Sequence, residues 1–157
     1  MEIATLNGPG QTVISGELAA VERACEIAAE KGAKRAIKLN VSGAFHSRLM
    51  ADAAEAMRKE LAGCPIREAS IPVVANVSAD YVRNPGEIRD ALVGQIVGAV
   101  RWEESVKQII ADGTTTFIEA GPGQVLRGLI KRIDANAVIF SVGDLKSLEE
   151  MLAGLAH

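Results

Sequence analysis

Short apolar runs alternate with segments of helical periodicity through most of the chain, and this order restricts the fold more than any other feature. Residues 71–76, 115–120 and 137–142 have the composition of buried strands. Between them, apolar side chains recur every three or four positions, as on the buried face of a helix. A parallel sheet flanked by helices satisfies this order, so we expect residues 42–157 to belong to an α/β unit.

Capping signals mark where several of the helices start and end. Asn84-Pro85-Gly86-Glu87 predicts a helix start, with asparagine as N-cap and proline at the first helical position. Asp144 predicts the start of the last helix, and Gly113 the end of one that begins near Trp102. The positions expected to face inward are Leu49, Ala53, Met57 and Leu61; Ile88, Leu92, Ile96 and Ala99; Trp102, Val106, Ile109 and Ile110; Leu126, Leu129, Ile130 and Ile133; and Leu148, Leu152 and Leu155.

The first 41 residues predict a smaller β-β-α-β unit. Turn-forming residues between two alternating runs are typical of a hairpin, and a glycine after a periodic segment is typical of a helix end. The expected elements are strands at residues 2–6 and 11–14, a helix at 17–31 that ends at Gly32, and a third strand at 35–41.

His46 lies where the third expected strand meets a helix that begins at Ser47, a suitable N-cap. Gly43, just upstream, permits backbone angles that other residues resist. A histidine at such a junction is rigidly supported and can face a cleft, which suits a general base. From the residues alone, a partly buried histidine that hydrogen-bonds to nearby carbonyls is an equally good interpretation.

Composition sets the remaining bounds. A chain of 157 residues with 48% hydrophobic content is long enough for a domain with a real core. A net charge of -3, without a basic stripe, gives no reason to expect a nucleic-acid partner. Cys25 and Cys64 lack metal-ligand spacing and are expected to be reduced thiols. With no signal-peptide pattern and no membrane-spanning apolar run, we expect a cytoplasmic protein.

The segment around His46, Asn-Val-Ser-Gly-Ala-Phe-His-Ser-Arg-Leu-Met, resembles the histidine motif of the malonyl-CoA:acyl-carrier-protein transacylases. These enzymes are also the acyltransferase domains of fatty-acid and polyketide synthases. Four further segments have counterparts in the same order, and the resemblance runs from the first residues nearly to the last. These segments are residues 7–16 (Asn-Gly-Pro-Gly-Gln), 71–77, 100–106 and 119–126 (Glu-Ala-Gly-Pro-Gly-Gln-Val-Leu).

The resemblance implies an α/β-hydrolase-like large subdomain with a ferredoxin-like small subdomain inserted in it. Residues 1–41 would be a partial small subdomain, and 42–157 the C-terminal part of the large one. The family's nucleophile is a serine in Gly-His-Ser-Leu-Gly-Glu, upstream of the segment that Asn7 opens, and no Gly-x-Ser-x-Gly occurs here. The first strand of the small sheet, which is central, would also lie upstream. We therefore expect a C-terminal half with an unpaired slot in that sheet, inactive alone.

The resemblance also implies a reaction. In ping-pong transfer, a serine attacks the malonyl thioester of coenzyme A, and the phosphopantetheine thiol of acyl carrier protein then takes the acyl group. His46 would accept the proton from the serine and later from the thiol. Gln95 would orient His46 through its main-chain carbonyl, on a helix where Gly94 replaces the family's usual arginine. Coenzyme A is here part of the substrate, and no resident cofactor is implied.

Two further residues match positions near the family's acyl pocket. Asn7 would line the cleft or hydrogen-bond the acyl group, and Phe45 would narrow the pocket against a branched methylmalonyl group. Their ordinary alternatives are a turn-forming asparagine and core packing, as Gln95 could be an ordinary polar helix residue.

The glycine-rich segment after Glu119 could suggest a phosphate cradle, but the dinucleotide fingerprint needs a third glycine where Leu126 stands. We therefore expect a structural role there. An acidic carrier protein could dock on either of two basic clusters, which could equally be solvated faces. The clusters are Lys31, Lys34, Arg35 and Lys38, and Arg127, Lys131 and Arg132.

Two other function classes stay open from the sequence. The chain could be a non-catalytic module that binds the carrier protein or pairs with an N-terminal partner carrying the serine. A stand-alone nucleotide-binding α/β domain is the weaker third hypothesis.

Overall fold

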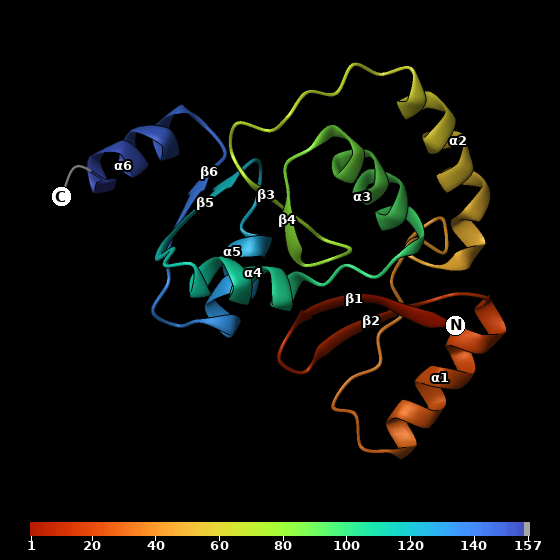
Figure 1. The fold of residues 1–157 in the computed structure, drawn as a ribbon. Coiled ribbons are helices and arrows are strands. Elements are labelled where there is room, and N and C mark those ends of the chain that lie inside the picture. Colours follow the sequence, from red (N-terminus) through yellow and green to blue (C-terminus); the bar gives the residue numbers. More distant parts are fainter. Residues whose placement is uncertain (156–157) are drawn as a thin grey trace.

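The structure is a computed structural model, and it describes residues 1–155. Within that range it contains three two-stranded sheets and six α-helices (Figure 1). The elements are β1 (Glu2–Gly8), β2 (Gln11–Ser15), α1 (Leu18–Glu30), η1 (a 3-10 turn, Arg48–Met50), α2 (Ala51–Ala62), β3 (Val73–Ala75), β4 (Asp80–Val82), α3 (Pro85–Val97), α4 (Trp102–Ala111), β5 (Thr116–Ala120), α5 (Val125–Ile133), β6 (Val138–Val142) and α6 (Leu145–Leu155). Among these residues, no helix is both long and apolar enough to cross a bilayer.

The predicted N-terminal hairpin is confirmed as the antiparallel pair β1–β2. Its strand β1 is fastened to the C-terminal part of the chain through Val100. The Val100 N–H donates to the Ala4 carbonyl, and the Leu6 N–H donates to the Val100 carbonyl, both at 2.8 Å. Strand β1 also packs against α4 and α5, so the hairpin lies beside these helices rather than apart from them (Figure 1).

The main core lies between the parallel pair β5–β6 and the helices α4 and α5. Its four buried residues are Val106, Ile130, Ala137 and Ile139, with Trp102, Ile110, Phe117 and Ile133 packed around them. The predicted inward faces of α4 and α5 are therefore largely confirmed. Leu126 is an exception, because it lies in the first turn of α5 and stays exposed.

The predicted helix caps are confirmed. Asn84 Oδ1 accepts the Glu87 N–H at 2.8 Å at the start of α3, and Asp144 Oδ1 accepts the Ser147 N–H at 2.8 Å ahead of α6. Each bond satisfies a donor that the first turn of a helix cannot pair internally. Gly113 follows α4 with φ of 93°, a left-handed conformation that glycine adopts without strain.

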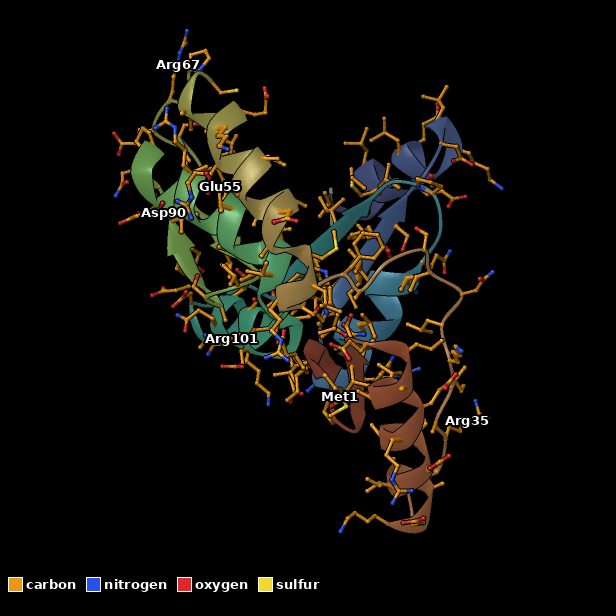
Figure 2. The ribbon with its side chains drawn as sticks, turned by 90° about the vertical axis from the view of Figure 1, so that its right-hand side faces the viewer. Met1, Arg35, Glu55, Arg67, Asp90 and Arg101 are labelled. Carbon is orange, nitrogen blue, oxygen red and sulfur yellow. The ribbon has the colours of Figure 1, made fainter. Side chains whose placement is uncertain are left out.

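The predicted third strand at residues 35–41 is wrong: this stretch forms no ladder with the described residues. Ile37, Leu39 and Val41 are 67%, 53% and 61% exposed. The alternation is that of a strand, but a strand also needs a neighbouring backbone to pair with. Figure 2 shows Arg35 on this trace, beside α1 and away from the rest of the molecule. The unpaired slot expected in the small sheet is consistent with this arrangement.

Several predicted inward faces are exposed for a related reason. The buried-type strand expected at residues 71–76 shrinks to β3, which pairs with the unpredicted β4 in a hairpin and leaves Ile71 exposed. In α2 and α6, the buried residues are Ala54 and Met151, next to the predicted stripes. The exposed members of those stripes are Leu49, Ala53, Met57, Leu148, Leu152 and Leu155.

Candidate active site

The backbone at His46 is unusual. Its φ of 58° lies in the left-handed region, which costs a non-glycine residue on the order of 1 kcal/mol. Ser47, almost fully buried, holds the turn: its hydroxyl donates to the Ala44 carbonyl at 2.7 Å and accepts the Leu49 N–H at 3.3 Å. Ser47 is thus the N-cap that the sequence predicts, here of η1. Strain of this kind persists only where the surroundings enforce it, which makes the position a candidate site.

The imidazole of His46 lies against the C-terminal end of α3. Its Nδ1 is 2.8 Å from the Gln95 carbonyl oxygen and 3.1 Å from the Gly98 carbonyl oxygen. Because carbonyl oxygens only accept, Nδ1 must carry the proton. In the neutral ring, Nε2 is then the acceptor, as a general base requires.

His46 and Gln95, predicted from sequence as a pair, are therefore in direct contact, through the main chain of Gln95. Gly94 directly precedes Gln95 on the same helix. The second acceptor, Gly98, carried no sequence signal, since a main-chain carbonyl belongs to every residue type.

Phe45 and Asn7, the two residues expected near the acyl pocket, differ from each other in exposure and in the elements that hold them. The Phe45 side chain is 47% exposed, and a Cβ placed on Gly43 would lie 3.4 Å from its ring, so the ring lies over the glycine rather than in the core. Asn7 is half-buried on β1, in a stretch where the pairing with β2 shifts register. Its neighbour Leu6 bonds to Val100, so Asn7 lies on the strand that adjoins the exit of α3.

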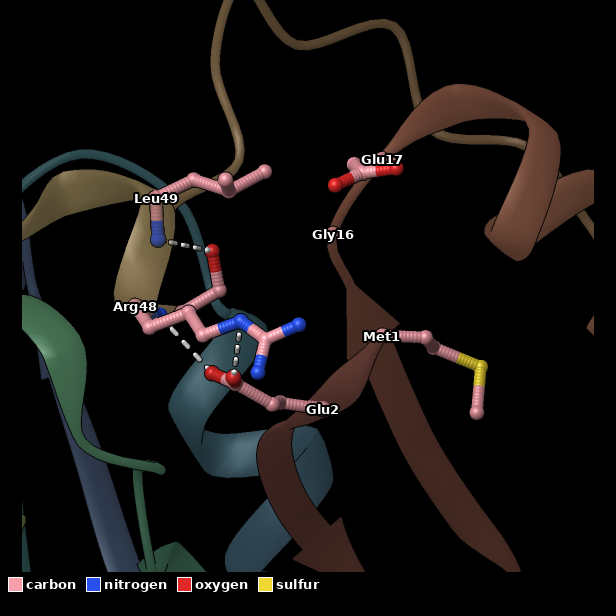
Figure 3. Close-up of a pocket in the computed structure, with 7 residues that line it drawn as sticks. Met1, Glu2, Gly16, Glu17, Arg48 and Leu49 are labelled. Atoms are coloured by element: carbon pink, nitrogen blue, oxygen red, sulfur yellow. Dashed lines mark hydrogen bonds and ion pairs between the residues drawn. The ribbon is translucent and has the colours of Figure 1, made fainter.

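Glu2 is a site neighbour that sequence reasoning missed. Figure 3 shows its carboxylate beside Arg48, in a small pocket that Met1, Gly16, Glu17, Ser47 and Leu49 also line. Glu2 Oε2 accepts the Arg48 N–H at 2.8 Å, and Oε1 lies 3.5 Å from Arg48 Nε. The ion pair is exposed and contributes little, but the first bond caps the turn that follows the histidine. No local pattern could indicate a contact between residues 46 positions apart.

Glu119 binds the main chain that follows the glycine-rich segment, and this contact indicates what the segment does. Its carboxylate accepts the N–H groups of Leu126 and Arg127 at 2.9 and 3.0 Å, at the start of α5, and the Ser141 hydroxyl at 3.3 Å. Burial acts to raise the pKa of Glu119, but these hydrogen bonds outweigh it and the pKa is lowered. The helix terminus is occupied by the protein's own carboxylate, which supports a structural role for this segment.

The matching family model is that of the acyl transferase domain, over residues 1–147. The malonyl CoA-acyl carrier protein transacylase of Bacillus subtilis is 48% identical over 149 residues, 95% of this chain and 47% of that protein. The crystal structure of the acyl-carrier-protein-S-malonyltransferase from Bartonella henselae superposes with a TM-score of 0.94 at 44% identity, covering 99% of this chain and 50% of that one. A solved malonyl-transacylase in complex with a type II PKS acyl-carrier protein superposes with a TM-score of 0.93 at 41% identity. The match covers 97% of this chain and 49% of that one.

The chain spans about half the length of these relatives. Its fold corresponds to the C-terminal part of an α/β acyltransferase domain. Relatives at this level of identity, together with a family model that covers nearly the whole chain, show the family. The chain belongs to the acyl transferase domain family, alongside the malonyl CoA-acyl carrier protein transacylases.

Proposed function

We propose that this chain supplies the histidine part of a site that transfers a malonyl group from coenzyme A to acyl carrier protein, in fatty-acid or polyketide synthesis. The observation that carries the proposal is the environment of His46. Its Nδ1 is held by two carbonyls, which leaves Nε2 as the proton acceptor. The names of the relatives support the choice of substrates.

In the proposed first half-reaction, a serine hydroxyl gives its proton to His46 Nε2 and attacks the thioester carbonyl carbon. The carbon–sulfur bond breaks, and the coenzyme A thiolate leaves with the proton from the imidazolium. In the second half, the phosphopantetheine thiol gives its proton to Nε2 and attacks the acyl-serine, and the proton returns to the serine oxygen. The carbonyls of Gln95 and Gly98 would stabilise the imidazolium in both halves, in the role that an aspartate has elsewhere.

The serine is proposed to come from a polypeptide segment outside this sequence, an N-terminal half. This chain holds no Gly-x-Ser-x-Gly turn. The unpaired stretch at residues 35–41, in which apolar and polar side chains alternate, supports the proposal, because a backbone that added a strand there would satisfy its exposed donors and acceptors. The exposed Ile71 and Leu49 would be covered by the same association.

Two residues would set the acyl specificity. The exposed Phe45 ring, two residues from Gly43 and next to His46, is proposed to narrow the pocket against branched acyl groups. Asn7 is proposed to line the cleft from β1. The two basic clusters offer docking surfaces for an acidic carrier protein. Two free cysteines, Cys25 and Cys64, fit a reducing compartment such as the cytoplasm.

Intact-mass measurement after incubation with malonyl-CoA tests the proposal. The chain is incubated alone and with a supplied N-terminal half that carries the serine motif. A malonyl adduct that forms only in the mixture, on the supplied serine, and disappears with His46→Ala is the expected result. Specific acylation of the lone chain would contradict it. Binding of the two halves without acylation would favour a non-catalytic, partner-binding module instead.

A further inference from the structure

The exit of α3 brings the Gly98 carbonyl to His46. After the last turn of the helix, the Gly98 N–H donates to the Gly94 carbonyl at 2.8 Å, and the backbone then turns extended, with φ of -84° and ψ of 156°. Two residues later, Val100 is tied to β1. The Gly98 carbonyl, 3.1 Å from His46 Nδ1, is therefore fixed from both sides along the chain.

Val77 leaves no room for a side chain at position 98. A Cβ on Gly98 would lie 2.6 Å from Val77 Cγ2 and 2.9 Å from the Gly94 carbonyl oxygen, both closer than real Cβ atoms come to their neighbours. Val77 is itself restrained, because Arg101 binds the carbonyls of both its chain neighbours, through its N–H at 2.8 Å and its Nη1 at 2.7 Å. The Gly94 contact is with the main chain of the same turn, so a side chain at position 98 must move the exit turn.

We propose that Gly98 is a positioning residue for His46. Its missing side chain lets the exit of α3 pass Val77, which places the Gly98 carbonyl beside that of Gln95 as a second acceptor for the Nδ1 proton. Two acceptors hold both the ring orientation and the tautomer in which Nε2 is free. Displacement of one leaves a single bond about which the ring can turn. This inference rests on the proposed function for the purpose of the arrangement, but the arrangement itself can be measured without catalysis.

The test is 15N NMR of the His46 imidazole in a His157→Gln background, where it is the only one of the chain's 2 histidines left. The proton is expected on Nδ1 and protected from exchange with water. Gly98→Ala should raise its exchange rate, or the fraction of the other tautomer, about fivefold, the effect of one net hydrogen bond. Gly94→Ala is the matched control: its Cβ would lie 3.8 Å from the same Val77 methyl, an ordinary contact, and the imidazole signal should not change.

A rescue variant separates positioning from general damage. Val77→Ala removes the closer obstacle and leaves the contact with the Gly94 carbonyl oxygen, so Val77→Ala/Gly98→Ala should recover part of the Nδ1 protection. The double variant carries the test if Gly98→Ala alone does not fold. An unprotected His46, or one protonated on Nε2, in the otherwise unsubstituted chain would overturn the proposal. So would equal effects of Gly98→Ala and Gly94→Ala. A protected Nδ1 proton without acylation in the complemented mixture would count against the proposed function and leave this inference standing.

Discussion

Two stretches meet at His46, and they differ in how their backbones are satisfied. The stretch formed by the end of α3 and the residues just after it, residues 95–101, bonds to His46, to β1 and to the loop beyond β3. The stretch before the histidine, residues 35–41, is exposed and forms no ladder with the described residues. The orientation of the histidine ring is therefore specified within this chain, whereas the stretch upstream of it has no partner strand among the described residues. The His46 ring is thus held by the stretch at residues 95–101 alone, without help from residues 35–41.

Loss of the imidazole should have the largest effect. In the mixture of this chain with a serine-bearing half, His46→Ala should slow acyl transfer by about 10³-fold, within the usual range for a general base. The measurement is the initial rate of malonyl adduct formation by mass spectrometry. Phe45→Ala is the comparison: it should retain the rate with malonyl-CoA and admit methylmalonyl-CoA. Retention of the full rate by His46→Ala would contradict the proposed role of His46 as general base.

The main core between β5–β6 and helices α4 and α5 should provide most of the stability of the lone chain. Val106 is 2% exposed at the centre of the main core, and Val106→Ala should lower the free energy of unfolding by about 2 kcal/mol. Urea denaturation followed by circular dichroism measures the change. The matched variant, Val41→Ala in the open stretch, should stay within about 0.5 kcal/mol of the parent chain. Equal effects at the two positions would mean that residues 35–41 are packed in solution.

Substitutions in residues 35–41 should affect binding of a partner rather than the stability of the lone chain. Ile37→Ala removes an exposed apolar side chain that an added strand would cover, so it should weaken association with the N-terminal half by about tenfold. Titration calorimetry with the two halves gives the dissociation constant. Leu145→Ala, equally exposed but on α6, is the control for a general loss of apolar surface. An unchanged dissociation constant for Ile37→Ala would place the contact elsewhere.

The same contrast explains which parts of the molecule could be predicted from sequence. The caps at Asn84 and Asp144 and the phase of α4 follow from neighbours within one or two helical turns, and local patterns are sufficient for them. The strand expected at residues 35–41 has the right alternation, but whether it pairs depends on a backbone that its own letters do not describe. The leucines of α6 form a stripe for the same local reasons, although the helix buries Met151 instead.

The candidate site divides in the same way. His46 and Gln95 could be predicted because the resemblance supplied both members of the pair. The Gly98 acceptor and Glu2 could not, since one contact uses a main-chain carbonyl and the other joins residues far apart in the chain. Glu119 was part of a recognised segment, but its partners became visible only with the start of α5 in place.

The smallest expected effect concerns Glu119, whose carboxylate accepts the main-chain N–H groups at the start of α5. Because folding lowers the pKa of Glu119, its stabilising contribution is present above the pKa of the unfolded chain, about 4.3, and is lost as the pH falls through the folded value. Glu119→Gln should therefore cost about 1 kcal/mol at pH 7, where one charge-assisted acceptor is lost. The difference from the parent chain should shrink as the pH falls below the pKa of the unfolded chain, and vanish once the folded carboxyl is protonated as well.

Urea midpoints of both chains across the acidic range measure this difference, with the exposed Glu149→Gln as a control for the loss of one negative charge. A difference that stayed constant from neutral to acidic pH would mean that the amide replaces the carboxylate by shape alone. In that case the start of α5 would be held by packing rather than by charge. The glycine-rich segment would then owe its conformation to the β5–β6 core.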